Sequence, residues 1–600
     1  MKRKNQINRN SALPDTVQRG FSPVHLLLVL LTALVFLAPS TSDAASQIRE
    51  PDDQEQPERL ALTGKVVDSR DKGLKDAEIA VFINGNPAEN SGILHSSSDG
   101  TFEADLVIPG GVLSSDTVTI EVSKPSYQNS GPIPIQFVAN EIDGDPRCEY
   151  LTNTHVELFR SITPAFWIAA GILLLVYVII ALELMHRTLA ALMGAGIILF
   201  VSYTFGTFSP DFFILSFEDA ISAVDFNVIF LLMGMMMIIG VLKKTGVFQW
   251  LSCKCYELAR GNIIVLSIIL MIVTAVLSAL LDNVTTMLLM IPVTIEIAIT
   301  LKLNPVALLL PEVFASNVGG AATLVGDPPN IMIGSYANLS FVDFLYNLGP
   351  ICLILLAVSV LYFVILYRKD YLKAQTSPEQ VKKTIEHLRQ EYRITDGKLL
   401  LYSGIVLGLT ILFFILHGVF GMEPSIAAVM FAGVLLVVGR IDIVEMLEHE
   451  VEWPTLIFFI MLFIVVAGAE ETGLIQIIAN WVNHMSGGSI VAAILIILWV
   501  SAIASAIVDN IPFTATMLPI VAYLTEVIPG AETGILWWAL ALGACLGGNG
   551  TMIGASANVV TVGMAERAGY HISFMHYMKI AFPPMLITIA ISSIWLLMVR

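Results

Sequence analysis

The chain has 600 residues, of which 56% are apolar and 14% are charged, and its mean hydropathy is +0.76. Such values are far from a soluble average and predict that most of the chain lies in lipid. The net charge of -18 is by itself a misleading guide to binding partners. Most of it comes from one segment, because residues 45–160 contain 20 acidic and 9 basic residues. That acidity belongs to one soluble segment, so no nucleic-acid partner is expected. Five cysteines without CxxC spacing indicate neither a disulfide framework nor a zinc site.

Residues 1–44 have the pattern of a signal peptide or an anchor helix. Basic residues crowd the first positions, an apolar run extends from His25 to Ala38, and Ser42-Asp43-Ala44 could serve as a cleavage site. The pattern leaves open whether the segment is cleaved. In either case its basic end stays in the cytoplasm and the residues that follow are exported.

Between residues 56 and 158 the pattern changes to short alternating runs, such as Thr63–Asp68 and Ala77–Phe82. Turn signals such as Asp99-Gly100 separate these runs. We therefore expect a small exported β-sandwich domain. The order of its runs resembles the transthyretin or carboxypeptidase-regulatory type of sandwich, and no catalytic constellation is visible in it.

Beyond Ile162 the apolar segments are each about 20 residues long, which is enough to cross a bilayer. Residues 162–367 and 399–600 show the same order of three spans, a helical hairpin, a broken helix and a closing span, and a basic linker, 368–398, joins them. The expected segments are 163–185, 189–206, 226–242, 262–300, 304–335 and 344–367 in the first half, and 399–418, 424–440, 455–470, 489–527, 533–561 and 577–599 in the second.

Paired motifs identify the two halves as an internal repeat. Asp282-Asn283 returns as Asp509-Asn510 at an offset of 227 residues. Similarly, the string from Gly319 to Asn330 returns from Gly547 to Asn558 at an offset of 228. Polar, glycine-broken strings at matching places in two hydrophobic halves are typical of secondary transporters built around a midplane site.

The second half is expected to be inverted in the membrane relative to the first. A hairpin adds an even number of crossings, so each half crosses an odd number of times. The charges agree, because Lys243-Lys244 is replaced by Glu470-Glu471 at the equivalent position. Basic residues favour the cytoplasmic side, and the linker 368–398 should therefore be cytoplasmic too.

The candidate ion or substrate site lies where the predicted helices break. Glycine lets the backbone leave helical geometry and Pro328-Pro329 removes two N–H donors, so free carbonyls result at membrane depth. Polar side chains beside them suit a partly dehydrated ion, although helix packing by small residues is the alternative explanation. The candidate binding residues are Asp282, Asn283, Thr285, Gly319, Gly320, Thr323 and Asn330 in the first half, and Asp509, Asn510, Gly547, Gly548, Thr551 and Asn558 in the second.

Asp282 and Asp509 carry the strongest functional signal. A carboxylate near the middle of a bilayer costs about 2.5 to 3.5 kcal/mol on insertion scales, so it is seldom present without a function. A bound cation keeps an aspartate ionised, whereas desolvation without a cation favours the protonated form. Each aspartate, with Asn283 or Asn510 beside it, is therefore a candidate sodium site at which a proton competes. The alternative is that the aspartates only cap helices.

These stretches also resemble a known family. Ser278–Val293, Gly319–Asn330, Ser505–Ile520 and Gly543–Val560 closely resemble the melanosomal P protein family. That family belongs to the ion transporter superfamily of ArsB-type arsenite permeases, NhaD-type sodium/proton antiporters and divalent-anion/sodium symporters. The resemblance covers the membrane region. It implies an all-α polytopic fold of two inverted repeats, each with a hairpin and a discontinuous helix, often as a homodimer.

Departures from the superfamily's patterns bear on the substrate. Dicarboxylate symporters have Ser-Asn-Thr at the hairpin tips, whereas this chain has Asp282-Asn283-Val284 and an equivalent Asp-Asn-Ile string. An anionic substrate there would meet a carboxylate and lack a hydroxyl donor, which argues against citrate or succinate. The NhaD-type antiporters are similar to this chain in having Asp-Asn at the tips.

The sequence therefore favours a secondary ion transporter of the cell (inner) membrane rather than an enzyme, and sodium/proton antiport is its most specific form. Membrane lipid and small inorganic ions are the expected partners, with sodium as the candidate bound ion and no other cofactor. Arsenite or oxyacid efflux and dicarboxylate-type symport are alternatives in mechanism. A passive ion channel and a membrane sensor whose sandwich binds a ligand are alternatives in class.

The inverted repeat predicts that Lys382, in the linker, and Glu471 lie on opposite sides of the membrane, with Lys382 in the cytoplasm. In intact cells a membrane-impermeant thiol reagent should label Glu471→Cys, whereas Lys382→Cys should react only after permeabilisation. Both variants are made in a background without the native cysteines. Equal labelling of the two positions in intact cells would contradict the inversion.

Overall fold

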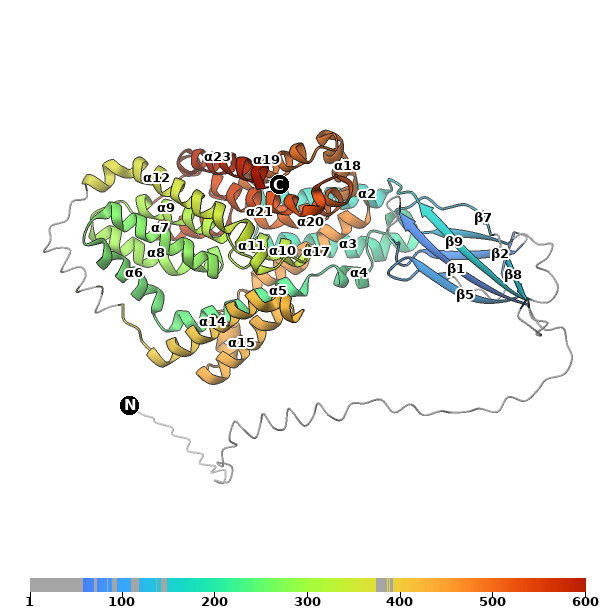
Figure 1. Ribbon diagram of the computed structural model, residues 1–600, viewed down its shortest axis with the longest axis horizontal. Helices are drawn as coiled ribbons and strands as arrows, with labels where there is room; N and C mark the ends of the chain where they lie inside the picture. Colours follow the sequence, from blue (N-terminus) through green and yellow to red (C-terminus); the bar gives the residue numbers. More distant parts are fainter. Residues whose placement is uncertain are drawn as a thin grey trace, which may run out of the picture.

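The computed structural model describes residues 58–68, 73–83, 85–88, 94–108, 118–135, 138–141, 148–373, 386, 388 and 392–599 (Figure 1). These residues form a mostly helical body with a small β-region at one end. Ten of the described helices are long and apolar enough to cross a membrane. The predicted fold class is thereby confirmed. The expected signal or anchor segment, 1–44, lies outside the described residues.

The β-region consists of two sheets that enclose one apolar core, to which Leu62, Ile79 and Ile120 contribute. In the first sheet the strand order is β5-β1-β9-β8, and β1 is antiparallel to β5 but parallel to β9. In the second sheet the order is β3-β2-β6-β7, and β4 also pairs with β2. The strands are β1 (Glu58–Asp68), β2 (Glu78–Ile83), β3 (Asn86–Pro87), β4 (Leu94–His95), β5 (Thr101–Ile108), β6 (Val118–Ser123), β7 (Ile133–Pro134), β8 (Val138–Glu141) and β9 (Cys148–Leu158).

The helical body contains the predicted hairpins and broken helices in both halves. The first half has α2 (Pro164–Ala181), α3 (Arg187–Phe208), α4 (Phe217–Ser222), α5 (Phe226–Lys244), α6 (Val247–Ala259), α7 (Ile263–Leu280), α8 (Asn283–Thr300), α9 (Val306–Gly320), α10 (Pro328–Tyr336), α11 (Phe341–Asn347) and α12 (Gly349–Lys373). The second half has α14 (Gly397–Phe420), α15 (Pro424–Gly439), α16 (Ile443–His449), α17 (Trp453–Glu471), α18 (Leu474–Ser486), α19 (Ile490–Ile507), α20 (Asn510–Val527), α21 (Ile535–Gly547), α22 (Ser556–Arg567) and α23 (Phe574–Val599).

Two equivalent helices, α6 and α18, were not expected from the sequence. Each has 13 residues, which is too short to cross a bilayer, and each carries polar residues on one face. Both pack against the hairpin of their own half, α6 on α7 and α8, and α18 on α19 and α20. They therefore buttress the hairpins.

Contacts between the two halves occur in exchanged pairs. Helix α5 packs on α15, and its counterpart α17 packs on α3; likewise α8 packs on α22 and α20 packs on α10. Such reciprocal contacts are what a two-fold axis between two copies of one unit requires. The structure therefore relates the halves as the repeat motifs predict.

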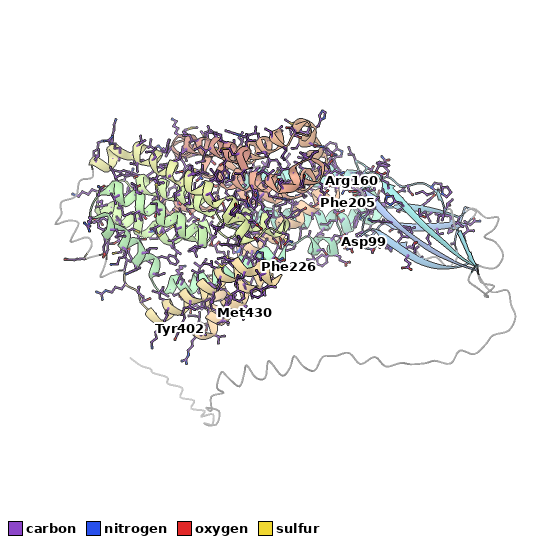
Figure 2. The ribbon with its side chains drawn as sticks, in the orientation of Figure 1. Asp99, Arg160, Phe205, Phe226, Tyr402 and Met430 are labelled. Carbon is purple, nitrogen blue, oxygen red and sulfur yellow. The ribbon has the colours of Figure 1, made fainter. Side chains whose placement is uncertain are left out.

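Large apolar side chains cover the outside of the helical body. Phe205, Phe226, Tyr402 and Met430, labelled in Figure 2, are all exposed although they are apolar or aromatic. In water such a surface would be unfavourable, whereas lipid tails contact it without penalty. The outer faces of these helices are therefore suited to lipid contact.

The β-region contacts the helical body at two places. Lys75 Nζ lies 3.1 Å from Asp219 Oδ1 on α4. Arg160, labelled at the junction in Figure 2, donates to the backbone carbonyl of Glu471 and stacks over the Tyr127 ring at 4.7 Å. Glu471, at the end of α17, thus lies beside the sandwich.

The lysine pair and the end of the linker lie at the far end of the body. Helix α5 begins soon after Asp219 and its 19 residues extend about 28 Å. Its last residue, Lys244, accepts a hydrogen bond from Thr395 at the end of the linker. A helix long enough to cross a bilayer therefore separates the described end of the linker from the sandwich and Glu471, as the inverted repeat predicts.

The Lys75–Asp219 pair should make docking of the sandwich sensitive to acid. Partial burial opposes ionisation of Asp219, but hydrogen bonds from Ser216 and Lys75 outweigh it and hold the pKa of Asp219 below its ordinary value of 3.8. A lowered folded-state pKa stabilises the contact above pH 3.8, and this stabilisation is lost as the pH falls through the folded-state value. Because the pair is partly exposed, it contributes at most about 1 kcal/mol.

Asp219→Asn at pH 7 should therefore lower the protection of the α4 amides against hydrogen–deuterium exchange. Acid should do the same in the unchanged protein when protection is taken relative to the intrinsic exchange rate at each pH. Asp211→Asn, a nearby exposed aspartate outside the pair, serves as the control and should leave exchange unchanged. Equal protection of α4 in all three proteins would show that the ion pair does not hold the sandwich.

Candidate ion-binding site

The tips of both hairpins face the broken helix of the opposite half. Asp282 precedes α8 and its carboxylate accepts a hydrogen bond from the Thr285 backbone N–H at 2.8 Å. Asp509 precedes α20 and accepts from the Ile511 backbone N–H at 3.3 Å. Both aspartates thus cap a helix, as the alternative explanation held. Each retains acceptor capacity, because a carboxylate has about four lone-pair positions.

A network of buried asparagines joins the first hairpin to the second broken helix. Asn283 Nδ2 donates to Asn317 Oδ1 at 3.1 Å, and Asn317 Nδ2 lies 3.0 Å from both Asn549 Oδ1 and Asn558 Oδ1. The Asn549 amide nitrogen has no hydrogen-bond partner among the described residues. Sequence analysis missed Asn317 and Asn549, although both stand within two residues of the paired glycines.

The second hairpin meets a third carboxylate. Asn510 Nδ2 lies 3.3 Å from both Asp327 oxygens, and Asp327 is only 1% exposed at the start of α10. Sequence analysis treated Asp327 as part of a proline turn and missed it. At the equivalent position the second half has Ala555, so this carboxylate occurs once.

Among the described residues, Asp509 has a basic partner and Asp282 does not. Arg187, at the start of α3, lies 2.9 Å from Asp509 Oδ2 and also donates to Ser556 and Thr455. No described basic side chain forms an ion pair with Asp282. The two aspartates, which the sequence motif suggests to be equivalent, therefore have different electrostatic surroundings. Arg187 gave no sequence signal, because it lies at the edge of a predicted span.

Several of the expected binding residues secure the helix breaks. Asn330 Nδ2 donates to the backbone carbonyls of Gly320, Ala321 and Thr323, at 3.3, 3.2 and 2.9 Å. Asn558 does the same for Gly548 and Thr551, at 2.8 and 2.9 Å. These carbonyls are therefore not free, contrary to our expectation from the sequence.

The threonines of the paired motifs have a similar role. Thr323 donates to the Ala279 carbonyl at 2.5 Å, and Thr551 donates to that of Ala506. Each bond ties a helix break to the first helix of the hairpin in its own half. Thr285 takes part through its backbone N–H. These threonine hydroxyls are thus engaged in holding the site together.

The paired glycines allow close packing and do not disrupt helical geometry. Gly319 and Gly320 end α9 in helical conformation, and Gly547 is also helical. A Cβ on Gly319 would lie 2.1 Å from the Ala275 carbonyl oxygen, and one on Gly547 would lie 2.4 Å from that of Ala502. The expectation that these glycines let the backbone leave the helix was wrong. The alternative, packing by small residues, accounts for them.

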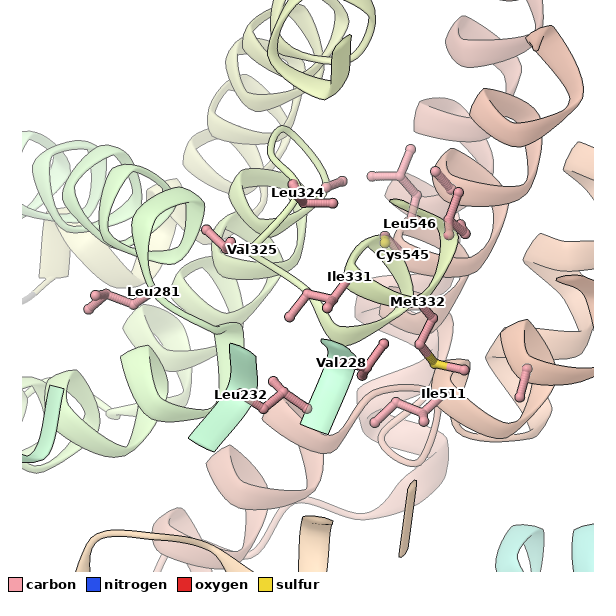
Figure 3. Close-up of a cluster of buried hydrophobic side chains, with 14 of the residues drawn as sticks. Val228, Leu232, Leu281, Leu324, Val325, Ile331, Met332, Ile511, Cys545 and Leu546 are labelled. Carbon is pink, nitrogen blue, oxygen red and sulfur yellow. The ribbon is translucent and has the colours of Figure 1, made fainter. Parts of the chain in front are cut away.

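An apolar shell surrounds the polar groups. Figure 3 shows side chains from α5, both hairpin tips, the first broken helix and α21 converging on this region, among them Leu281, Ile331 and Ile511. Such surroundings strengthen electrostatic interactions between the enclosed groups. Asp327 accordingly interacts electrostatically with both Asp509 and Asp282.

The described part of the site therefore includes the carboxylates of Asp282, Asp327 and Asp509 and the guanidinium of Arg187. The half-buried carboxylate of Glu452 lies next to it, bonded to the Thr455 hydroxyl that Arg187 also contacts. No group of three or more histidine, cysteine, aspartate or glutamate side chains converges closely enough to hold a metal ion, within the described residues. A cation bound here would take its ligands from single carboxylates together with amide oxygens. The arrangement can bind a small cation or protons, but it offers little to an anion.

Comparison with known proteins adds to this geometry. Residues 177–543 match the family model described as CitMHS, citrate transporter. An uncharacterized transporter of Mycobacterium bovis is 42% identical over 430 residues, covering 72% of this chain and 97% of that protein. The P protein of Homo sapiens is 34% identical over 593 residues, covering 86% of this chain and 66% of that protein. A solved dioxygenase structure from Rhodococcus opacus aligns with 22% of this chain and 78% of its own, at 13% identity and a TM-score of 0.14.

The glycine contacts yield a stability prediction. Gly319→Ala should destabilise the protein by roughly 1–3 kcal/mol, because the added methyl group meets backbone and not a movable side chain. Gly404→Ala in α14 is the matched control, since nothing lies within 4 Å of its added Cβ. Thermal unfolding of the purified proteins, followed by tryptophan fluorescence, measures both. A melting temperature of Gly319→Ala equal to that of the control would contradict the close packing of α7 and α9.

Proposed function

We propose that this chain, which belongs to the citrate transporter family of membrane transporters, is a sodium/proton antiporter whose exchange site includes Asp282 and Asp327. Asp509 is held in an ion pair with Arg187 and supports the site. The asparagines between the hairpins and the broken helices provide neutral oxygen ligands.

The balance of charges is the observation that carries this proposal. Arg187 neutralises Asp509, which leaves Asp282 and Asp327 without a described basic partner. An unpaired buried carboxylate either takes up a proton or retains a cation, because an isolated buried charge is strongly unfavourable. A site with this property binds a cation and a proton in alternation, and that alternation is cation/proton exchange.

Sodium suits the available ligands. The site contains carboxylate, carboxamide and hydroxyl oxygens, and hard cations prefer such oxygens. The thiol of Cys545 lies 3.4 Å from Asn330 Oδ1, so it is already engaged. A soft metal ion would find no thiolate pair in this region, as far as the structure describes it.

Citrate is the second candidate, because the matching family model is described as a citrate transporter. A tricarboxylate needs several cationic or N–H donor groups. Here Arg187 is already engaged, and Asp282 and Asp327 would repel the anion. We therefore favour the cation, and citrate becomes an outcome of the test.

The test uses purified full-length protein in liposomes that contain a pH-sensitive dye. Addition of sodium on one side should drive protons in the opposite direction, whereas potassium or choline should not. Citrate added without sodium tests the second candidate. Citrate-dependent proton movement in the absence of any sodium response would overturn the antiporter.

Removal of either tip carboxylate should abolish exchange, for different reasons. Asp282→Asn removes a group that alternates between cation and proton, and Asp509→Asn leaves Arg187 without its counter-ion. Sodium-driven proton flux should therefore fall to the level of protein-free liposomes in both variants. Pairing Asp509→Asn with Arg187→Gln should recover thermal stability, because no unpaired charge is left.

Asp225→Asn is the matched control. Asp225 caps α5 through hydrogen bonds from Asn227 and Val228 but lies outside the asparagine network. Since asparagine caps helices as well as aspartate does, this variant should keep flux within about twofold. Near-normal flux in Asp282→Asn and Asp509→Asn would eliminate the carboxylate mechanism and favour oxyacid transport or a channel.

A further inference from the structure

A fourth buried carboxyl group lies outside the exchange site. Glu312 is in the middle of α9 and is completely buried. Its Oε1 accepts hydrogen bonds from Thr274 on α7 and Thr294 on α8, both at 3.2 Å. Its Oε2 has no hydrogen-bond partner among the described residues. An unpaired oxygen at such a buried position calls for a physical explanation.

The described surroundings of Glu312 provide no counter-ion. Its hydrogen-bond donors are neutral hydroxyl groups, and no described lysine, arginine or histidine forms an ion pair with it. The titratable neighbour on α6 is the buried thiol of Cys255. The Tyr371 hydroxyl on α12 donates to the carbonyl of Ala307, which precedes Glu312 at the start of α9. A proton on Oε2 would remove the charge that nothing else there compensates.

Glu312 has no counterpart in the second half. The equivalent position is Leu540, which is fully buried among apolar side chains. A carboxyl needed only for the repeated scaffold would be expected in both halves. Glu312 therefore serves something that only the first half does.

A row of hydroxyl groups lies between Glu312 and the tip of the first hairpin. Ser316 is one helical turn from Glu312 on the same face of α9, and Ser278 is one turn from Thr274 on α7. Ser316 Oγ donates to Ser278 Oγ at 3.1 Å and contacts the Asn283 carbonyl at 3.4 Å. The row thus ends at the backbone carbonyl of Asn283, the residue that follows Asp282.

We propose that Glu312 is a proton-binding site of the transport cycle, separate from the cation site, which passes its proton to the hairpin tip along the Ser316–Ser278 row. The O–H bond on Glu312 breaks and an O–H bond forms on the carboxylate of Asp282 when sodium leaves, so the transfer leaves the summed charge of the two carboxyl groups unchanged. The hydroxyl groups of Ser316 and Ser278, which line this side of α9, turn toward Glu312 and then toward Asp282 to carry the proton. No other reactant is required. This inference rests on the proposed sodium/proton exchange.

Two exchange modes separate this role from that of Asp282. Glu312→Gln keeps the size of the side chain but cannot bind a proton, so sodium-driven proton flux should fall to background. Exchange of labelled sodium for unlabelled sodium needs no proton and should persist within about twofold. Asp282→Asn should lose both modes. Glu296→Gln on α8, a part-buried glutamate bonded to Tyr392 outside the row, is the matched control and should retain both.

An infrared pH titration tests the proton site without any transport. The unchanged protein should show a carbonyl band of a protonated carboxylic acid that is missing in Glu312→Gln. If the two proteins show the same carbonyl band, the inference is overturned, whether or not sodium drives proton flux. A lack of sodium-driven proton flux in the unchanged protein, in contrast, would count only against the proposed function. Proton flux by Glu312→Gln with an unchanged pH profile would also overturn the inference, as would loss of both exchange modes in a folded variant.

If Glu312→Gln does not fold, Ser316→Ala replaces it as the test. This variant should slow proton flux and leave sodium exchange unchanged, and an equal loss of both modes would contradict the inference.

Discussion

Charge neutralisation inside an apolar body is the constraint on which the rest of this structure depends. Asp327, Asp509 and Glu312 are buried, Asp282 is half-buried beside them, and Arg187 forms an ion pair with Asp509. The remaining carboxyl groups need a proton or a cation, because the protein supplies no other counter-ion among the described residues. The composition of the interior thus suits protons or small cations, before any particular ligand geometry is considered.

Repetition and asymmetry have separate roles in this molecule. Equivalent residues, such as Asn330 and Asn558, make equivalent bonds across each helix break, so the scaffold obeys the two-fold relation. The acidic groups do not obey it, since Asp327 and Glu312 are replaced by Ala555 and Leu540. The repeat therefore builds the framework twice, whereas one copy carries most of the acidic chemistry.

The sequence predicted those parts of the fold that depend on hydrophobic periodicity or on a local motif. The hairpins and broken helices were found because long apolar runs and paired motifs mark them. The helices α6 and α18 were missed because thirteen half-polar residues resemble a loop. Arg187, Asn317 and Asn549 were missed for a different reason. Their roles come from contacts with residues more than two hundred positions away, and no local pattern records such contacts.

The function of the paired glycines was misread for a related reason. A glycine in a sequence suggests conformational freedom, but the backbone contact of Gly319 with Ala275 is visible only when α7 and α9 are seen together. Likewise the free carbonyls expected at the breaks are occupied by Asn330 and Asn558, whose amide groups lie seven to ten residues farther along the chain.

The close contact of α7 with α9, and of α19 with α21, limits how the protein can change shape. Backbones that touch without intervening side chains cannot slide past one another, and the threonine bonds to Ala279 and Ala506 fasten them further. Each hairpin must therefore travel with its broken helix as a single rigid piece. Alternating exposure of the site then requires shear along the seams where one half meets the other, such as α8 against α22, and no bending within either half.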